Sequence, residues 1–262
     1  MRRPDVVSKF EILTSRLRMR PQFLVIGAQK AGTSSVHSYL IEHPHVLAPK
    51  RKEVRYFGSE HNEEKGLSWY FAHFPLIRPG RQGIYITGES SPNYMYRKGT
   101  IEKIHRVLPD VKLIMVLRDP TERAISHHNM ISRLRDGEFP PFEEIVDQYL
   151  EGAEIPAETS KVGFIERGYY LRQIENILEY FSRDQLKITI LDDLMRDPKK
   201  ESNRLYSFLG LGPFALRNYR KANIGNYETE PDKIVRQKLR RHYEPFNSKL
   251  YDFLGRNLNW NK

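Results

Sequence analysis

Apolar residues along the chain form two kinds of pattern, short continuous runs and longer segments with helical spacing. The continuous runs, typical of strands that are buried on both faces, lie near residues 22–27, 45–48, 84–88, 111–117 and 186–191. Helical spacing occurs near residues 33–42, 66–74, 100–107, 120–135, 142–150, 165–182, 198–209 and 232–254. Because predicted strands alternate with predicted helices, the pattern indicates an α/β fold with three layers, a parallel sheet flanked by helices.

The first predicted strand runs into a glycine-rich loop that carries a lysine and several hydroxyl groups. Gly27 and Gly32 allow backbone N–H groups to approach an anion, and the helix that follows directs its positive end to the same place. The glycines have the Walker A spacing, but Thr33 stands where that loop has its lysine, and Lys30 precedes the second glycine. Glycines are also common at ordinary strand–turn–helix corners. With support from elsewhere, the loop predicts a site for a phosphate-like group other than the triphosphate of ATP.

That support comes from the segment that follows the predicted strand 111–117. Asp119 is suited to cap the next helix, and Pro120 is suited to its first turn. Arg118 then lies at the carboxyl end of the strand, where ligands bind in open α/β sheets. Ser126 follows about two helical turns later, within reach of the same anion.

In this order, the two segments resemble the sulfotransferases that use 3′-phosphoadenosine-5′-phosphosulfate (PAPS). The first is similar to the family's loop for the 5′-phosphosulfate, and the second to its 3′-phosphate site. The chain is most similar to the heparan sulfate sulfotransferases, especially the 3-O-sulfotransferase type. Further matching segments are residues 52–57, 66–70, 88–94 and 253–256, so the resemblance runs from about residue 21 to the end of the chain.

The resemblance implies a P-loop-like fold, PAPS as the sulfate donor and 3′,5′-ADP as its product. Sulfuryl transfer needs a base for the acceptor proton and stabilisation of charge on the leaving phosphate. Glu53 matches the catalytic base of the family, although it could instead be a surface glutamate paired with Lys52 or Arg55. Lys30 suits the leaving oxygens. The residues expected to bind the donor are Gln29, Lys30, Ala31, Gly32, Thr33, Ser34, Arg118, Ser126, Gly225 and Tyr227.

Three departures from the heparan sulfate enzymes limit what the resemblance implies, two of them near the donor sulfate and acceptor and one in the stretch that caps the cosubstrate. Ser90 replaces a lysine, Arg55 replaces a histidine two residues after the base, and residues 220–227 keep only a glycine–aromatic ending. We therefore expect Arg55 and Ser90 to contact an acceptor that differs from theirs. A hydroxyl of a carbohydrate, a hydroxyacyl group or a small natural product is expected, in preference to an amine.

Length and composition predict a single domain over residues 1–262, with residues 1–20 as an N-terminal extension. The sequence has no apolar run of about 18 residues and no signal-peptide pattern, so no membrane span is expected. It also has no cysteine and no N-x-[ST] glycosylation site. Animal relatives are Golgi-anchored, and these differences indicate a cytoplasmic, bacterial enzyme. The oligomeric state is not readable from the sequence.

The formal net charge of +10 suits a polyanionic donor and an acidic acceptor, although a solvated basic surface would look the same. No nucleic-acid-binding motif occurs, so no nucleic-acid partner is expected. The 9 histidines show no zinc spacing, and neither cysteine nor a D-x-D motif is present. We therefore expect no metal site.

Two other functions remain open on the sequence. A P-loop kinase would use residues 113–117 and Asp119 as an imitation of a Walker B motif, but it lacks the Walker lysine. A non-catalytic module that binds anions or polysaccharides could retain the same fold. Ser90, in place of the family's lysine, is the best argument for that alternative.

Overall fold

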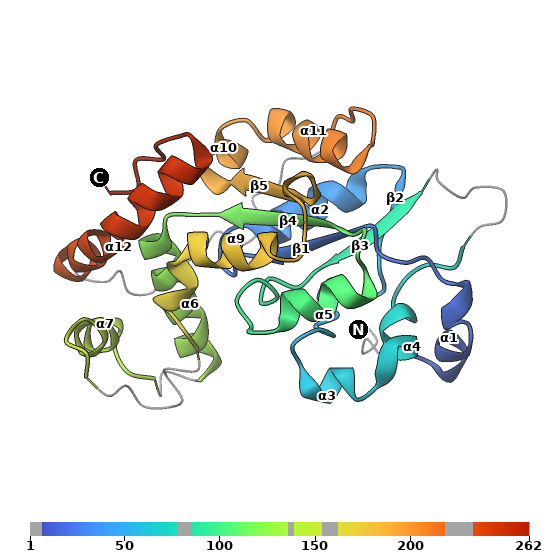
Figure 1. Cartoon of the computed structure of the whole chain (residues 1–262), viewed down its shortest axis with the longest axis horizontal. Helices are drawn as coiled ribbons and strands as arrows, with labels where there is room; N and C mark the ends of the chain where they lie inside the picture. Colours follow the sequence, from blue (N-terminus) through green and yellow to red (C-terminus); the bar gives the residue numbers. More distant parts are fainter. Residues whose placement is uncertain (1–6, 78–84, 136–138, 154–161, 218–232, 262) are drawn as a thin grey trace. The chain divides into compact units, whose positions relative to one another are not determined.

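The computed structural model describes residues 7–77, 85–135, 139–153, 162–217 and 233–261 (Figure 1). The chain forms two compact units. The first consists of Met1–Val116 and Asn176–Asn223, and the second of Leu117–Glu175 and Ile224–Lys262. The organisation as one domain with an N-terminal extension stays a prediction.

The first unit is built on a five-stranded sheet with the order β2-β3-β1-β4-β5. The pairs β1–β3, β1–β4 and β2–β3 are parallel. The strands are β1 (Phe23–Gly27), β2 (Val46–Leu47), β3 (Ile86–Ser90), β4 (Lys112–Leu117) and β5 (Leu186–Ile190). The predicted parallel α/β sheet is therefore confirmed.

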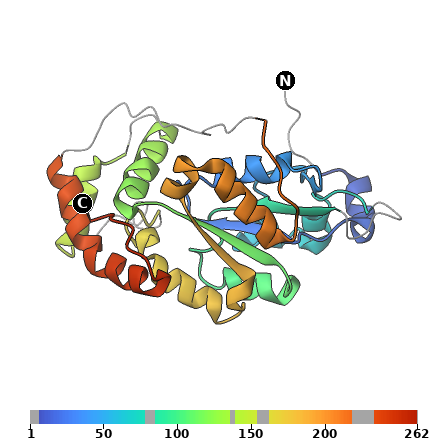
Figure 2. The ribbon, with the colours of Figure 1, turned by 90° about the horizontal axis from the view of Figure 1, so that it is seen from above.

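Helices cover both faces of this sheet (Figure 2). Helices α2 (Thr33–Glu42) and α11 (Pro198–Leu209) lie on one face, and α5 (Thr100–Val107) lies on the other. Because both faces are covered, every residue of β1 is buried, as is every residue of β4 after Lys112. The remaining elements of this unit are α1 (Lys9–Leu13), η1 (Ser15–Leu17), α3 (Glu60–Glu63), α4 (Gly66–Phe71), η3 (Arg183–Gln185) and α10 (Leu191–Arg196).

Close packing at the centre of the sheet explains one glycine of β3. Gly88 pairs with Phe23 of β1. A Cβ at position 88 would lie 2.2 Å from the carbonyl oxygen of Phe23, well inside contact distance. Only glycine therefore allows β3 to approach β1 at this point, and this approach fixes the residues that follow, Glu89 and Ser90.

The second unit is helical in its described part and has an apolar core of its own. It contains α6 (Pro120–Leu134), α7 (Phe142–Leu150), η2 (Glu166–Gly168) and α12 (Lys233–Leu254), and α9 (Tyr170–Leu178) begins in it. The core includes Ile125 of α6, Val146 of α7 and Leu239 of α12, each at most 2% exposed. Among the helices of the described residues, none combines the length and the apolar character needed to cross a membrane.

The prediction of one continuous helix over residues 165–182 is wrong. The structure has the short 3-10 helix η2 there, then the non-helical Tyr169, and then α9. A Cβ at Gly168 would lie 2.7 Å from the ring of Tyr243 and 2.8 Å from Pro120. Tight tertiary packing at a residue with poor helix propensity therefore separates the two helical pieces.

Candidate active site

The loop between β1 and α2 has the backbone of an anion site. Gly32 is the N-cap residue of α2 and has φ 95°, in the left-handed region that favours glycine. Because glycine has no side chain, it cannot satisfy the N–H groups at the start of the helix. Those donors and the positive end of the helix favour a bound anion. Lys30 also has a positive φ, 70°, and such conformations in non-glycine residues concentrate at functional sites.

The start of this loop lies close to its neighbours in the sheet. A Cβ at Gly27 would lie 1.8 Å from the Met95 sulfur, so any other residue would force the Met95 side chain to move. The Ala28 N–H donates to the Val116 carbonyl of β4 at 2.8 Å, which holds the loop against the neighbouring strand. In the same loop the Oε1 atom of Gln29 is buried and finds no hydrogen-bond partner in the part of the chain that the structure describes. A buried polar atom of this kind is expected to meet a partner from outside the chain.

Glu53 lies beside the first turn of α2, held by two cationic side chains. The Lys52 ammonium donates to Ser34 Oγ at 2.7 Å and to Glu53 Oε1 at 3.3 Å. The Arg55 guanidinium donates to Glu53 Oε2 from Nε at 2.9 Å and from Nη2 at 2.5 Å. Both ion pairs considered for Glu53 are therefore present. They hold its carboxylate next to the loop, with 24% of the side chain exposed.

The segment that carries Glu53 is fixed by a buried carboxylate at the end of β3. Glu89 is 0% exposed and accepts hydrogen bonds from the Val54 N–H at 3.0 Å, Ser91 Oγ at 2.6 Å and the Tyr94 hydroxyl at 2.7 Å. The Tyr70 hydroxyl adds a fourth donor at 3.4 Å. Burial raises the pKa of Glu89, and these hydrogen bonds act in the opposite direction. The sequence comparison included Glu89 in a matching segment but gave it no role.

The residues after Glu89 complete this anchoring. The Ser90 N–H donates to the Lys52 carbonyl at 2.8 Å, and the Arg55 N–H donates to Ser91 Oγ at 3.0 Å. Three consecutive residues of the chain thus each bind the segment 52–55. The side chains of Lys52, Glu53 and Arg55 take no part in these bonds and are left for other contacts.

Ser90 contacts a histidine, His37, that the sequence analysis did not select. Its side chain is buried, and Ser90 Oγ lies 2.8 Å from Nδ1 of His37 on α2. Burial, with the nearby Lys52 ammonium, lowers the pKa of His37 to about 4, although Glu53 opposes this shift. The imidazole is therefore neutral near pH 7. One signal was available in the sequence, because a residue three positions after Ser34 in a helix lies on the same face.

In the second unit, Arg118 and Ser126 lie at the start and in the middle of the segment that forms α6. The Arg118 carbonyl accepts a hydrogen bond from the Tyr170 hydroxyl at 2.8 Å. Asp119 caps α6, accepting from the Thr121 N–H at 2.8 Å, and Pro120 begins the helix. The predicted cap and helix start are therefore confirmed. Ser126 is 8% exposed on the second turn of α6.

The remaining predicted donor residues, Gly225 and Tyr227, lie outside the described residues. Ala31 and Thr33 lie in the loop and on the first turn of α2, both buried. Within the described ranges, no three His, Asp or Glu side chains gather as a group that could hold a metal ion.

Comparison with known proteins gives the family. The model of the sulfotransferase domain matches residues 20–250 of the chain. The chain therefore belongs to the sulfotransferase family, and the resemblance stated from its motifs is confirmed. It is a sulfotransferase enzyme, and family membership implies PAPS as the sulfate donor.

Individual relatives agree with this assignment. Mouse heparan sulfate glucosamine 3-O-sulfotransferase 5 is 28% identical over 261 residues, which cover 92% of this chain and 74% of the relative. Human heparan sulfate glucosamine 3-O-sulfotransferase 3B1 is 29% identical over 280 residues, covering 98% and 69%. Among solved structures, a sulfotransferase from Alicyclobacillus acidocaldarius has 25% identity and a TM-score of 0.72, and the match covers 93% of this chain and 99% of that one.

Proposed function

We propose that this enzyme transfers the sulfuryl group of PAPS to a hydroxyl group of its acceptor, with Glu53 as the base. The observation that carries the proposal is the position of the Glu53 carboxylate. Through Lys52 and Ser34, it is linked to the first turn of α2, where the helix has no side-chain cap and favours an anion.

The loop before α2 is proposed to bind the 5′-phosphosulfate. The backbone of Gly32 and the N–H and hydroxyl groups of Thr33 and Ser34 offer hydrogen bonds, and Gln29 and Ala31 line the loop. Lys30 neutralises charge on the leaving phosphate, which is the usual role of a preorganised cation at a developing anion. These residues suit PAPS because α2 begins at Gly32 without a side-chain cap, so N–H groups at its start are available to an anion.

Arg118 and Ser126 are proposed to bind the 3′-phosphate. A guanidinium fork with a nearby hydroxyl group is suitable chemistry for a phosphate dianion, because the hydrogen bonds are charge-assisted. Gly225 and Tyr227 are proposed to cover the nucleotide.

In the proposed step, the acceptor oxygen attacks sulfur from the side opposite the bridging oxygen of the donor. The new O–S bond forms as the bond between sulfur and the 5′-phosphate oxygen breaks. The acceptor proton passes to the Glu53 carboxylate, and 3′,5′-ADP leaves with the bond electrons. The protein must supply in-line positioning, removal of the proton and stabilisation of charge on the leaving phosphate.

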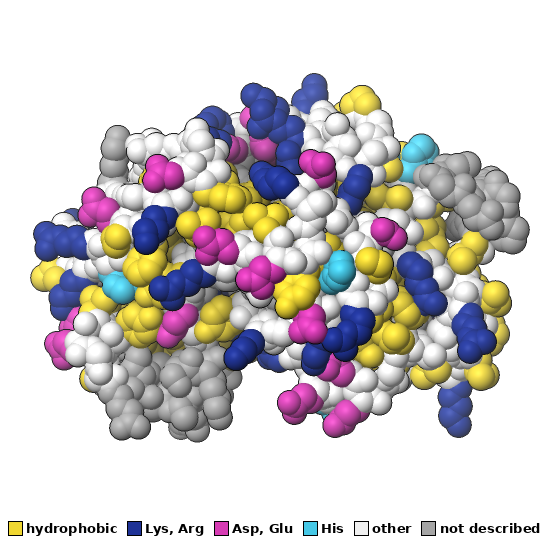
Figure 3. Space-filling view, in the orientation of Figure 1, with side chains coloured by type: hydrophobic (Ala, Val, Ile, Leu, Met, Phe, Trp, Pro, Cys, Tyr) yellow, Lys and Arg dark blue, Asp and Glu magenta, His cyan; other side chains and the backbone are white. Residues whose placement is uncertain are grey.

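The acceptor is proposed to be a carbohydrate, a hydroxyacyl group or a small natural product that carries negative charge. The names of the relatives give heparan sulfate glucosamine as their substrate. Here the side chain of Arg55 beside the base is 56% exposed, which suits an anionic acceptor. On the face drawn in Figure 3, basic side chains are interspersed with acidic ones, so a local group such as Arg55 is a better candidate for recognition than a broad basic surface.

The test is transfer of labelled sulfate from PAPS to a panel of acceptors, with and without EDTA. We expect transfer that EDTA leaves intact, and a fall in turnover of roughly 10²–10³ in Lys30→Ala, with a smaller loss of donor binding. A strict magnesium requirement with transfer from ATP would instead favour a kinase. Donor binding without transfer to any acceptor would favour a binding module.

A further inference from the structure

We propose that Lys52 is a catalytic residue whose ammonium group contacts the sulfuryl group during transfer. This inference rests on the proposed function, because it assumes that the donor phosphate binds at the start of α2 and that Glu53 takes the acceptor proton. Neither the family comparison nor the motif analysis assigns a role to Lys52.

The first argument is position. Lys52 Nζ lies 2.7 Å from Ser34 Oγ on the first turn of α2 and 3.3 Å from the Glu53 carboxylate. During transfer, sulfur must lie between the phosphate that it leaves and the oxygen whose proton goes to the base. A group that contacts both the donor loop and the base therefore borders the path of the sulfuryl group. An ammonium has three N–H donors, and the two contacts use two of them.

The second argument is preorganisation. The backbone of Lys52 is held by the Ser90 N–H, which donates to the Lys52 carbonyl at 2.8 Å. Its side chain is only 30% exposed, so water screens its charge less than it would on an open surface. A fixed cation in such a place stabilises negative charge that develops on the transferring group, without reorganisation at the moment of reaction.

The third argument concerns the neighbouring His37. This imidazole is 7% exposed, hydrogen-bonded to Ser90 and close to both Lys52 and Glu53. Burial, together with Lys52, keeps His37 uncharged near pH 7. His37 therefore adds no positive charge beside Glu53, whose carboxylate is contacted by the two cations Lys52 and Arg55. Lys52 also contacts Ser34 at the start of α2, so it is the cation that bridges the donor loop and the base.

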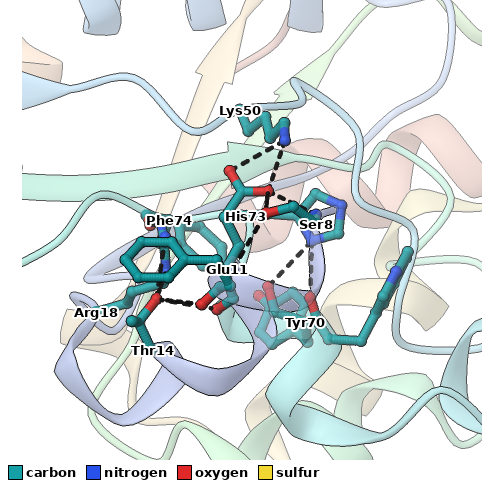
Figure 4. A network of polar contacts seen from close by, with 10 residues as sticks. Ser8, Glu11, Thr14, Arg18, Lys50, Tyr70, His73 and Phe74 are labelled. Atoms are coloured by element: carbon teal, nitrogen blue, oxygen red, sulfur yellow. Dashed lines mark hydrogen bonds and ion pairs between the residues drawn. The ribbon is translucent and has the colours of Figure 1, made fainter. Parts of the chain in front are cut away.

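The experiment compares Lys52→Met with the matched control Lys50→Met. Lys50 lies two residues away, and its ammonium contacts Glu11 at 2.7 Å (Figure 4). Each variant removes one positive charge from the same basic run. Turnover with PAPS and the affinity for 3′,5′-ADP, which lacks the sulfuryl group, would be measured for both.

We expect Lys52→Met to lower turnover by roughly 10²–10³. The affinity for 3′,5′-ADP should change by less than about threefold, because this nucleotide lacks the sulfuryl group that Lys52 is proposed to contact. A tenfold change would correspond to a loss of about 1.4 kcal/mol in binding free energy. Lys50→Met should keep wild-type turnover, and Lys52→Arg should recover part of the loss. Retained 3′,5′-ADP binding also shows that the variant is folded.

A second measurement follows the His37 imidazole by NMR as pH is changed. In Lys52→Met the pKa of His37 should rise from about 4, because the ammonium that helps to lower it is gone, and in Lys50→Met it should stay. Wild-type transfer combined with turnover within threefold in Lys52→Met would overturn the role of Lys52 and leave the proposed function standing. If the wild type transferred sulfate to no acceptor, both the proposed function and the role of Lys52 would be overturned. The His37 titration would still show whether the Lys52 ammonium lies close to His37.

Discussion

Two side chains of the site, His37 and Glu53, lie in different surroundings. His37 is buried between α2 and β3, where a charged imidazole would be poorly solvated and close to Lys52. Glu53 is partly exposed and receives hydrogen bonds from two cations. A carboxylate in that setting is available to accept a proton, which is what the proposed base must do.

Glu53→Gln tests the base directly. Glutamine keeps the size and most hydrogen bonds of the side chain but has no basicity, so we expect turnover to fall by about 10²–10⁴ with nearly unchanged affinity for 3′,5′-ADP. The matched control is Glu102→Gln, which removes an exposed ion pair with Arg106 on α5 and should cost about 0–1 kcal/mol of stability and little activity. A Glu53→Gln enzyme with more than about a third of wild-type turnover would show that another group is the base.

At the scale of the secondary-structure element, α6 begins with a half-buried cap whose charge is unfavourable. Asp119 accepts hydrogen bonds from the Thr121 and Glu122 N–H groups, which favour the carboxylate. Burial is the larger effect and raises the pKa of Asp119 to about 6. The folded protein therefore holds the proton more tightly than the unfolded chain does. The free energy of unfolding due to this group is highest at low pH and falls as pH rises from about 4 to about 6.

Asp119→Asn separates the cap from the charge. Asparagine caps helices about as well as aspartate but does not titrate. Relative to wild type, the variant should therefore gain stability as pH rises from 4 to 7, by up to roughly 3 kcal/mol for a shift of about two pKa units. Urea unfolding at several pH values measures this difference. Asp119→Ala loses the cap as well and should be about 1 kcal/mol less stable than Asp119→Asn at every pH. If the difference in free energy of unfolding between Asp119→Asn and wild type did not depend on pH, the raised pKa of Asp119 would be contradicted.

Elements with strong local signals were predicted well from the sequence, and contacts made only in the folded chain were not. Helices α2, α5, α7 and α11 have the predicted bounds, because apolar periodicity and flanking residues agree. The break at Gly168 was missed because it depends on a ring from α12. Among candidate site residues, the loop and Glu53 were proposed from their motifs, and their roles stay predictions. His37 was missed because its partner Ser90 lies 53 residues away.

At the scale of the whole molecule, the chain folds as two compact units, and the proposed 3′-phosphate residues Arg118 and Ser126 both belong to the second. A pair of nucleotides that differ only in the 3′-phosphate therefore tests this assignment within the second unit.

We expect 3′,5′-ADP to bind far more tightly than 5′-AMP, and Arg118→Ala to remove most of the difference. Each charged hydrogen bond is worth about 1.5–3 kcal/mol, which corresponds to about tenfold to a hundredfold in affinity. Calorimetric titration of both nucleotides measures this. Arg133→Ala removes an exposed arginine of α6, the helix that follows Arg118, and should leave both affinities unchanged. Equal affinity of the wild type for the two nucleotides would refute the assignment.

The attachment of the segment 52–55 to β3 has a consequence for how such enzymes diverge. Its three anchoring bonds use main-chain groups of Lys52, Val54 and Arg55, so they do not depend on which side chains stand at positions 52, 53 and 55. A substitution at these positions changes the chemistry presented beside the donor loop while the main chain stays in place. Lys52 and Glu53 have proposed roles in catalysis, so Arg55 is the position at which a single replacement would change the acceptor without insertion or loss of residues in the loop. Its φ of 55° favours replacements that tolerate the left-handed region, such as glycine or asparagine.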